Sequence, residues 1–348
     1  METVPVELIA TFVGLIGGLV LGLAARLGDF CTLGALESAA YGRDQRRLRL
    51  WGVVLAVASA GAFGAEALGY ADLTQTYYHS LEWMPLASIV GGRVFGYGMA
   101  LAGNCGFGAL VRFGGGDLRS MVVVVVMGIF AFVTLSGPLA PLRAMLFAQE
   151  PASGAQGIAH WLSGRMGVSP LMIALPIAAL LLIWALSYRP LRTDLRRVIW
   201  GVAAGLAVVW CLVATSYLNA ESLGTVAIEA PSFTAPLGRT ILYFMTSTAG
   251  GLTFSVGLVG GVLAGSFLGS AIRGLFQWEA CDDPRELGRQ VTGAALMGIG
   301  GTVALGCSVG QGVSAMSVLA FSAPVTLAAI IVGGLLGLRH MIHGYLPN

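Results

Sequence analysis

Long apolar stretches with almost no charge dominate this sequence. Of its 348 residues, 10% are charged and 56% are hydrophobic, whereas soluble globular domains carry about 25% charged residues. A chain of this length with so few charges cannot cover itself with a water-facing surface. The sequence therefore predicts an all-α polytopic membrane protein in which residues 1–348 form a single membrane domain.

The uncharged runs divide into about nine transmembrane helices, because an apolar helix of about 20 residues crosses the hydrocarbon core of a bilayer. We expect these helices over about 6–27, 50–70, 85–103, 119–138, 169–187, 198–218, 252–272, 290–305 and 324–340. The runs 240–272 and 290–338 are too long for one crossing and contain glycine-rich breaks at Gly250-Gly251 and Gly306-Cys307. Non-helical backbone at membrane depth is tolerated only where protein or a water-filled path surrounds it. We therefore also expect about four short re-entrant or inserted helices.

The arginines predict the orientation, since cytoplasmic loops carry the excess of positive charge. With nine helices, 14 arginines fall in loops on one side of the membrane and three in loops on the other. This distribution places the N-terminus outside and the C-terminus in the cytoplasm. Glu2 and Glu7 open the chain where a signal peptide would carry basic residues, so we expect the first apolar run to be retained.

Two cysteine-containing segments are related by a constant offset of 202 residues. Six positions match: Gly96, Gly98, Ala102, Cys105, Gly108 and Val111 fall on Gly298, Gly300, Ala304, Cys307, Gly310 and Val313. A four-helix unit followed by one connecting helix re-enters the membrane upside down, a recurring transporter design. We therefore expect an inverted pseudo-twofold repeat, with repeat one over about 1–145, a connecting helix over about 165–190 and repeat two over about 196–348. Cys31 lacks a partner, because the offset places Phe233 opposite it.

Three motifs taken together resemble the YeeE/YedE family of sulphur-compound transporters. They are Phe30-Cys31-Thr32-Leu33-Gly34-Ala35, Leu101-Ala102-Gly103-Asn104-Cys105-Gly106 and Leu305-Gly306-Cys307-Ser308-Val309-Gly310-Gln311-Gly312. The resemblance implies a transporter of the bacterial inner membrane with an hourglass-like fold and short helices inserted from both faces. It also implies that a small sulphur anion, with thiosulfate the leading candidate, passes along Cys31, Cys105 and Cys307.

A dianion that leaves water needs donors that replace its hydration. Free backbone N–H groups at helix ends supply such donors, and glycine lets the backbone come close. We therefore expect Gly106, Gly108, Gly306 and Gly310 to cradle the anion. Neutral thiols are weak donors, which suits a path whose sites must release what they bind. We hypothesise that Cys307 receives the anion from outside, Cys105 takes it through the constriction and Cys31 passes it to the cytoplasm.

Three polar side chains are further candidates for this path. Asn104 and Gln311 flank the cysteine loops, where their amides either contact the substrate or satisfy the carbonyls of broken helices. Arg93 is the one arginine well inside a predicted transmembrane helix and not at its edge, and such residues face a partner or a polar path. It either attracts the anion, pairs with Glu66 or reaches towards an interface.

Several functions are excluded or weakened. No basic stripe is present to bind nucleic acid, and the glycine-rich runs lack the lysine of a phosphate-binding loop. His340 and His343 have no third metal ligand nearby, and we expect Cys211 and Cys281 to be packing residues or free thiols. We predict no catalytic residue, metal or cofactor.

Three alternatives remain open. One is a membrane thiol oxidoreductase or sulphurtransferase that carries a cysteine persulfide, for which a low-pKa thiolate would be needed. The second is a transporter of another sulphur or selenium compound, and the third is a channel for neutral solutes. The arginines in 43–49 and 189–197 set the topology, and they could also dock a cytoplasmic sulphur-carrier protein.

Overall fold

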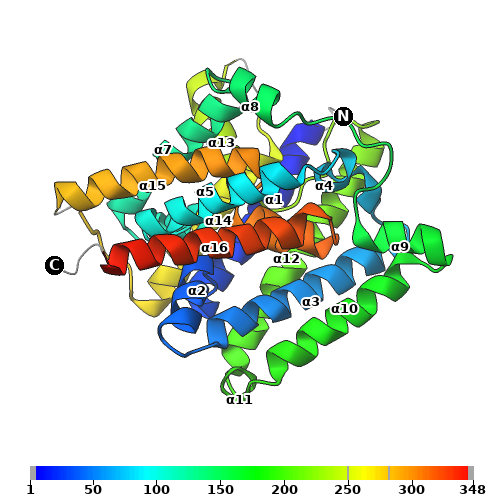
Figure 1. Cartoon of the computed structure of the whole chain (residues 1–348), viewed down its shortest axis with the longest axis horizontal. Helices are drawn as coiled ribbons and strands as arrows, with labels where there is room; N and C mark the ends of the chain where they lie inside the picture. Colours follow the sequence, from blue (N-terminus) through cyan, green and yellow to red (C-terminus); the bar gives the residue numbers. More distant parts are fainter. Residues whose placement is uncertain (1–4, 249–250, 281–282, 344–348) are drawn as a thin grey trace.

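The computed structural model describes residues 5–248, 251–280 and 283–343, and within these ranges the protein is helical, with isolated β-bridges but no sheet (Figure 1). Each predicted transmembrane segment contains a helix. These helices are α1 (Val6–Gly28), α3 (Arg46–Ala67), α5 (Pro85–Ala102), α7 (Leu118–Leu135), α10 (Pro170–Leu186), α12 (Leu195–Glu221), α14 (Phe254–Arg273), α15 (Pro284–Val303) and α16 (Ser322–His343). The remaining elements include η1 (Leu73–Gln75), α4 (Tyr77–Ser80), α8 (Ala140–Leu146), α9 (Ile158–Met166) and α11 (Arg189–Arg192).

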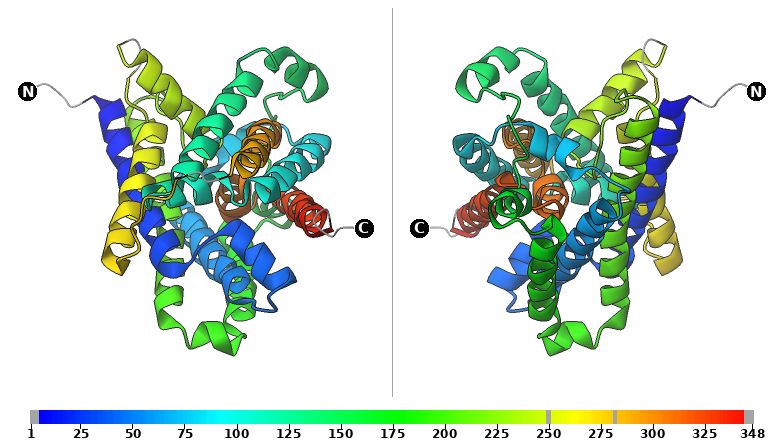
Figure 2. Two further views of the ribbon diagram at one scale, coloured as in Figure 1. Left: turned by 90° about the vertical axis from the view of Figure 1, so that its left-hand side faces the viewer. Right: turned by 90° about the vertical axis from the view of Figure 1, so that its right-hand side faces the viewer.

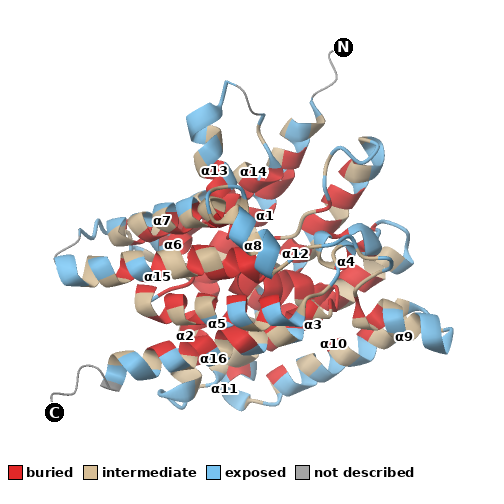
Figure 3. Ribbon diagram, turned by 45° about the horizontal axis from the view of Figure 1, so that its top comes forward, coloured by how far each residue is buried: buried red, intermediate tan, exposed pale blue. Residues whose placement is uncertain are grey.

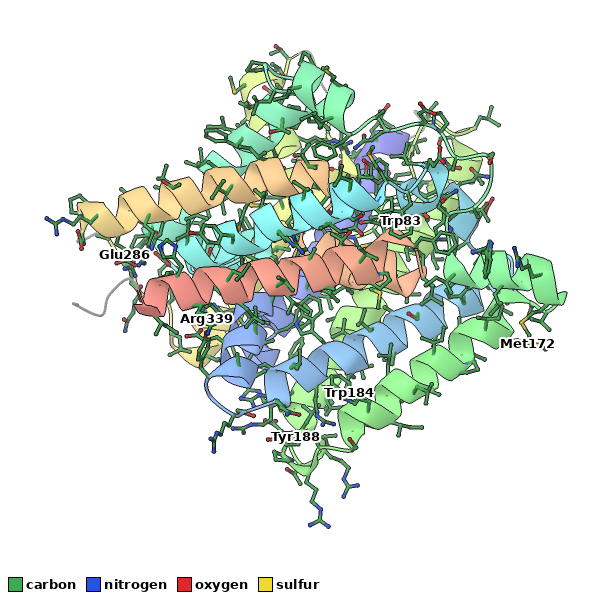
Figure 4. All side chains as sticks on the ribbon, viewed as in Figure 1. Trp83, Met172, Trp184, Tyr188, Glu286 and Arg339 are labelled. Atoms are coloured by element: carbon green, nitrogen blue, oxygen red, sulfur yellow. The ribbon has the colours of Figure 1, made fainter. Side chains whose placement is uncertain are left out.

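Seven helices of the described ranges are long and apolar enough to cross a membrane. The two predicted crossings that do not reach this standard are α10, with 17 residues, and α15, whose first turns carry Arg285, Glu286 and Arg289. The surface fits an apolar surrounding, since large apolar side chains project from the outer helices. Met172 on α10, for example, is 67% exposed at the rim of the molecule (Figure 4). These features are those of a polytopic membrane protein.

Short helices lie among the long ones. They are α2 (Thr32–Ala40), α6 (Gly106–Gly114), α13 (Ala235–Thr246) and a helical segment over 308–317, whose middle part, η2 (Gly310–Ala315), is a π-helix. The break predicted at Gly250-Gly251 falls partly outside the described residues, because Gly250 is not among them. Buried residues gather at the centre of the molecule, while α11 at the rim is mainly exposed and α9 is partly exposed (Figure 3).

Glycines let the long helices approach closely. A Cβ on Gly18 of α1 would lie 2.2 Å from the carbonyl oxygen of Leu258 on α14, and one on Gly257 would lie 1.9 Å from that of Thr11. A Cβ on Gly96 of α5 would likewise lie 2.1 Å from the oxygen of Ile330 on α16. Such backbone contacts through small residues are typical of helix association in membranes. Figure 2 shows α1 and α14 side by side, and in Figure 1 α5 lies between α15 and α16.

The 202-residue offset relates contacts as well as sequence positions. It carries α1, α3, α5 and α7 approximately onto α12, α14, α15 and α16, and it carries α2 and α6 onto α13 and the 308–317 segment. The helix pairs follow the same rule. α1 packs on α14 as α12 packs on α3, and α5 packs on α16 as α15 packs on α7.

Candidate thiol-lined transport site

The three motif cysteines occupy equivalent positions in the chain, each directly before a short helix. Two residues before each cysteine the backbone takes a left-handed conformation, at Asp29 (φ 58°), Gly103 (φ 74°) and Leu305 (φ 59°). This conformation ends the preceding helix and reverses the direction of the chain. Glycine adopts it without strain at Gly103, whereas aspartate and leucine do so at a steric cost. The turns place Cys31, Cys105 and Cys307 at the starts of α2, α6 and the 308–317 segment.

Cys105 is fully buried at the N-terminus of α6. Its Sγ accepts a hydrogen bond from the Gly108 N–H at 3.3 Å, and its thiol donates to Thr32 Oγ1 at 3.7 Å. The sulphur therefore satisfies one of the free N–H groups at the start of the helix, as an N-cap does. A Cβ on Gly106 would lie 2.5 Å from Met127 Sδ, so this glycine lets α6 pack against α7.

Cys307 has the same arrangement in the second half of the chain. Its Sγ accepts hydrogen bonds from the N–H groups of Gly310 and Phe233, both at 3.3 Å, and it is 1% exposed. Gln311 follows in the π-helical turn and donates to the carbonyls of Ala304 and Leu305, at 3.0 and 3.1 Å. Its amide thus satisfies the carbonyls at the break between α15 and the inserted helix.

Thr32 connects the two cysteine loops. Its Oγ1 accepts from the Cys105 thiol and donates to Ser308 Oγ at 3.1 Å, beside Cys307. Cys31 lies close to the same point, since a Cβ on Gly108 would be 3.5 Å from Cys105 Sγ and 3.8 Å from Cys31 Sγ. The three cysteines therefore belong to one cluster with two hydroxyl groups, in which Cys105 and Cys307 are buried and Cys31 is half-buried.

Aromatic residues lie beside the cysteines: Phe30 precedes Cys31, Phe107 follows Cys105 by two residues, and the N–H of Phe233 donates to Cys307. The rings of Phe107 and Phe233 have centroids 4.9 Å apart, and Phe30 lies 6.3 Å from Phe107 and 4.9 Å from Trp51. Phe107 and Phe233 are fully buried. Apolar walls exclude water and strengthen every electrostatic interaction inside the site.

A cavity of about 370 Å³ lies on one side of Cys307. It is bordered by the C-terminal ends of α7, α12 and α15, at Leu135, Asn219 and Thr302, and it reaches Gly306, the residue before Cys307. Tyr77 and Tyr78 line it, and burial raises the pKa of Tyr78, so that this phenol remains a protonated donor.

The other end of the site, near Cys31, is rich in arginine. Asp29 lies beside it, but its carboxylate pairs with Arg197 at 3.0 Å and with Arg273 at 3.5 Å. Arg47 is also near, because a Cβ on Gly34 would lie 2.5 Å from its Nη1. The negative charge of Asp29 is therefore more than balanced.

The remaining predicted residues lie in different surroundings. Asn104 is buried and donates to Ser120 Oγ at 3.4 Å, while its Oδ1 has no partner among the described residues. Arg93 is exposed on α5, away from the buried cluster. The structure corrects the alternative that joined Arg93 to Glu66, because Glu66 pairs with His160 at 2.8 Å.

Two further cysteines and the metal prediction can also be placed. Cys211 is fully buried in α12 against α1, where a Cβ on Gly17 would lie 2.4 Å from its Sγ, while Cys281 lies outside the described residues. No cluster of His, Cys, Asp or Glu suited to a metal occurs in the described part of the chain.

Sequence reasoning overlooked the hydroxyl groups of the site. Thr32 and Ser308 each directly follow a motif cysteine, and the 202-residue offset takes Thr32 to Thr234, which lines the cavity. That offset was the one available signal for Thr234. The cavity itself combines segments that are far apart in the sequence.

Comparison with known proteins adds a family and two relatives. A family model described as sulphur transport matches residues 27–336. The thiosulfate transporter TsuA of Spirochaeta thermophila is 25% identical over 336 residues, which cover 92% of this chain and 96% of that protein. The thiosulfate transporter TsuA of Escherichia coli is 24% identical over 333 residues, which cover 92% and 91% of the two chains.

Proposed function

The chain belongs to the sulphur transport family, and from this premise we propose that it imports thiosulfate or a closely related small sulphur anion. Both similar proteins carry the name thiosulfate transporter and align with it over nearly their whole lengths. In this proposal the protein is a transporter and not an enzyme, and its substrate undergoes no covalent step.

One observation carries the proposal: two buried thiols, Cys105 and Cys307, have the same backbone arrangement and are linked through Thr32 and Ser308. In each case an N–H group donates to the sulphur, which leaves the thiol hydrogen available for another acceptor. At Cys105 this hydrogen goes to Thr32, and at Cys307 no acceptor is recorded within the described residues. A passing anion is an acceptor of the kind that such a thiol can serve.

The anion enters from the cavity beside Gly306, meets Cys307, moves to Cys105 and leaves past Cys31. Neutral thiols bind it weakly enough for onward movement, and the aromatic rings keep competing water away. Gly106, Gly108, Gly306 and Gly310 keep the backbone close to this path. The arginines beyond Cys31 attract the anion towards the exit, where the loops 43–49 and 189–197 could dock a sulphur-carrier protein.

The proposed architecture is one membrane transporter domain with nine crossings of the bacterial inner membrane. Four inserted helices, an hourglass-like shape and an inverted repeat complete it, with repeat one over about 1–145 and repeat two over about 196–348. The matched contacts of α1, α5, α12 and α15 with their partners support the repeat. The distribution of arginines supports an outer N-terminus and a cytoplasmic C-terminus, and with this proposed orientation the 370 Å³ cavity would lie on the outer side.

The test is uptake of labelled thiosulfate by cells that lack their own thiosulfate importers. Cys105→Ala and Cys307→Ala should each lower the rate by about 10-fold or more, because each removes a donor to a charged substrate. Cys211→Ala is the matched control, since this thiol is equally buried but packs against α1.

Unchanged uptake by both cysteine variants would reject the thiol path. A stable persulfide on Cys105 or Cys307, detected by mass spectrometry after exposure to substrate, would favour the sulphurtransferase alternative. If the cells took up selenium compounds and not thiosulfate, the proposed substrate would be wrong, while the proposed path through the thiols would stand.

A further inference from the structure

An apolar groove of about 170 Å³ opens on the side of the molecule, between α10 and α16. Residues of α2, α3, α5, α10 and α16 line it, and all of them except Thr32 are apolar or aromatic. At its opening Trp184 is 42% exposed and Ile331 is half-buried. Next to them on the same helices, Ile183 and Val332 are exposed. The opening therefore lies on a surface suited to the hydrocarbon of a membrane.

The groove has the size and lining for part of a lipid chain. An apolar cavity of about 150 Å³ stays free of water and holds a six-carbon ring, so this groove has room for roughly six carbons of an acyl chain. Lipid tails are as apolar as leucine, however, so the walls alone do not select one lipid over another. Selection requires a charged group at the mouth of the groove.

Arg49 supplies such a charge. Its guanidinium carbon lies 5.0 Å from the centroid of the Trp184 ring, which lines the groove, and 5.1 Å from that of Tyr188. Gly52 leaves room for the Trp184 ring, since a Cβ on this glycine would lie 2.9 Å from it. Figure 4 shows Trp184 and Tyr188 towards the end of α10. Tryptophan and tyrosine gather at the boundary between hydrocarbon and headgroups, so Arg49 lies where a phosphate would be.

The guanidinium of Arg49 has no carboxylate partner among the described residues. Its Nε donates to Gln45 Oε1 at 3.1 Å, and its Nη1 donates to Ser187 Oγ at 2.7 Å and to the carbonyl of Trp184. No hydrogen bond of Nη2 is recorded within the same ranges. Two arginines of α11, which contacts α3, also lack a carboxylate partner in the described part of the chain; they are Arg189 and Arg192. Basic pockets between membrane helices bind anionic lipid headgroups.

We propose that the groove between α10 and α16 binds an anionic phospholipid, with one acyl chain in the groove and the phosphate on Arg49. A zwitterionic lipid also carries a phosphate, but the unpaired arginines favour a lipid with net negative charge. The acyl chain contacts Thr32, whose hydroxyl links Cys105 to Ser308. The lipid therefore packs directly beside the thiol cluster. Its binding does not depend on which solute the protein transports.

The first experiment detects lipids bound to the purified full-length protein by native mass spectrometry, in an equal mixture of phosphatidylglycerol and phosphatidylcholine with the same acyl chains. The unaltered protein should retain phosphatidylglycerol in preference. Arg49→Gln should lower this preference about fivefold, the effect of one positive charge near a membrane surface. Arg165→Gln is the control, because this arginine lies over the ring of Trp161 on α9 and away from the groove, and the preference should persist.

A second pair of variants locates the bound chain. Ile331→Trp fills the groove and should abolish retention of phosphatidylglycerol, whereas Val332→Trp adds the same ring on the exposed face of α16 and should leave retention unchanged. Equal retention by these two variants would overturn the proposal. Equal retention of the two lipids by the unaltered protein would also overturn it.

The second experiment keeps the proposal testable even if Ile331→Trp fails to fold. It measures quenching of tryptophan fluorescence in bilayers that contain a small fraction of lipid with brominated acyl chains. The signal of Trp184 is the difference between the unaltered protein and Trp184→Phe, and brominated phosphatidylglycerol should quench it more than brominated phosphatidylcholine. Trp161 is the matched control, since Arg165 lies 4.5 Å from its ring but it does not line the groove, and the two lipids should quench it alike. Equal quenching of Trp184 by the two lipids would overturn the proposal.

Discussion

The loops of Cys105 and Cys307 share a backbone arrangement and differ in what stands opposite the sulphur. Each sulphur accepts the N–H of the glycine three residues later, at 3.3 Å. Beside Cys105 lies a second thiol, Cys31, whereas the equivalent position beside Cys307 holds Phe233, which offers a backbone N–H and a ring. The backbone of the two loops is therefore alike, but the groups beside the two sulphur atoms differ. In the proposed path these unlike ends would give a direction, with Cys307 on the receiving side and Cys31 on the delivering side.

The largest expected effect comes from a methyl group placed between the two thiols of the first loop. A Cβ on Gly108 would meet Cys105 Sγ at 3.5 Å and Cys31 Sγ at 3.8 Å, which are ordinary contacts. Gly108→Ala should therefore fold normally, and alanine is favoured over glycine in a helix by about 1 kcal/mol. The methyl occupies the space between the sulphurs, so we expect thiosulfate uptake to fall by about 10-fold or more, as when a donor to the charged substrate is lost.

The matched control is Gly64→Ala, where a Cβ would meet nothing within 4 Å. Thermal unfolding in detergent should show no loss of stability for either variant. Normal uptake by Gly108→Ala would mean that the anion does not pass between Cys105 and Cys31, and the difference between the two loops would then lose its functional meaning.

The cysteine loops were predictable because their signals are local. The spacing of Gly103, Cys105 and Gly108, repeated 202 residues later, places each thiol at a helix break, and apolar runs reveal the flanking helices. The turns at Asp29 and Leu305 were not predictable in the same way, because a left-handed leucine carries no sequence signal.

Pairing between distant segments was also beyond the sequence. Glu66 pairs with His160 of α9, which is far from it in the sequence, and the cavity beside Gly306 gathers residues of 75–80, 227–239 and 301–306. Such contacts depend on how helices pack, and the apolar pattern of a membrane helix gives little indication of its neighbours.

The far ends of the two inserted helices offer a second comparison. Beyond α6, Asp117 forms a β-bridge with Glu279, and Arg119 pairs with both carboxylates. Beyond the 308–317 segment, Ala320 forms a β-bridge with Gly157, and the nearby carbonyl of Val318 accepts from His79 Nε2 at 3.1 Å. One attachment relies on arginine and the other on histidine, so acid should affect them differently.

The second-largest effect that we expect is a loss of folding stability in acid that depends on His79. Burial, with a smaller contribution from His160, lowers the pKa of His79 to about 4. The titratable groups that face His79 are His160, which pairs with Glu66, and Asp72. Because the unfolded chain has a histidine pKa of about 6.5, it takes up the proton first, and stability should fall by about 2 kcal/mol between pH 7 and pH 5. Above pH 7 this contribution should be constant.

His79→Gln tests this attachment, because the glutamine amide can still donate to Val318 but does not titrate. Unfolding followed from pH 7 to pH 5 should show a shallower acid slope for this variant, while His340→Gln should keep the original slope. An unchanged slope in His79→Gln would assign the acid sensitivity to another group and remove this difference between the two ends.

The smallest effect should separate two threonines related by the 202-residue offset. Thr32 bridges Cys105 and Ser308 within the thiol cluster, whereas Thr234 directs its Oγ1 at Gly301, without a hydrogen-bond partner among the described residues. Thr32→Val keeps the shape of the side chain and removes two hydrogen bonds, so we expect the maximal uptake rate to fall roughly threefold. The half-saturating concentration should change little, and Thr234→Val, which removes a hydroxyl with no hydrogen bond among the described residues, should leave the uptake rate unchanged. Ser308→Ala should lower the rate by a similar factor, and the double variant should add little, because both changes break one linked pair. If Thr234→Val lowered the rate as much as Thr32→Val does, the two halves would be alike in function as well as in scaffold.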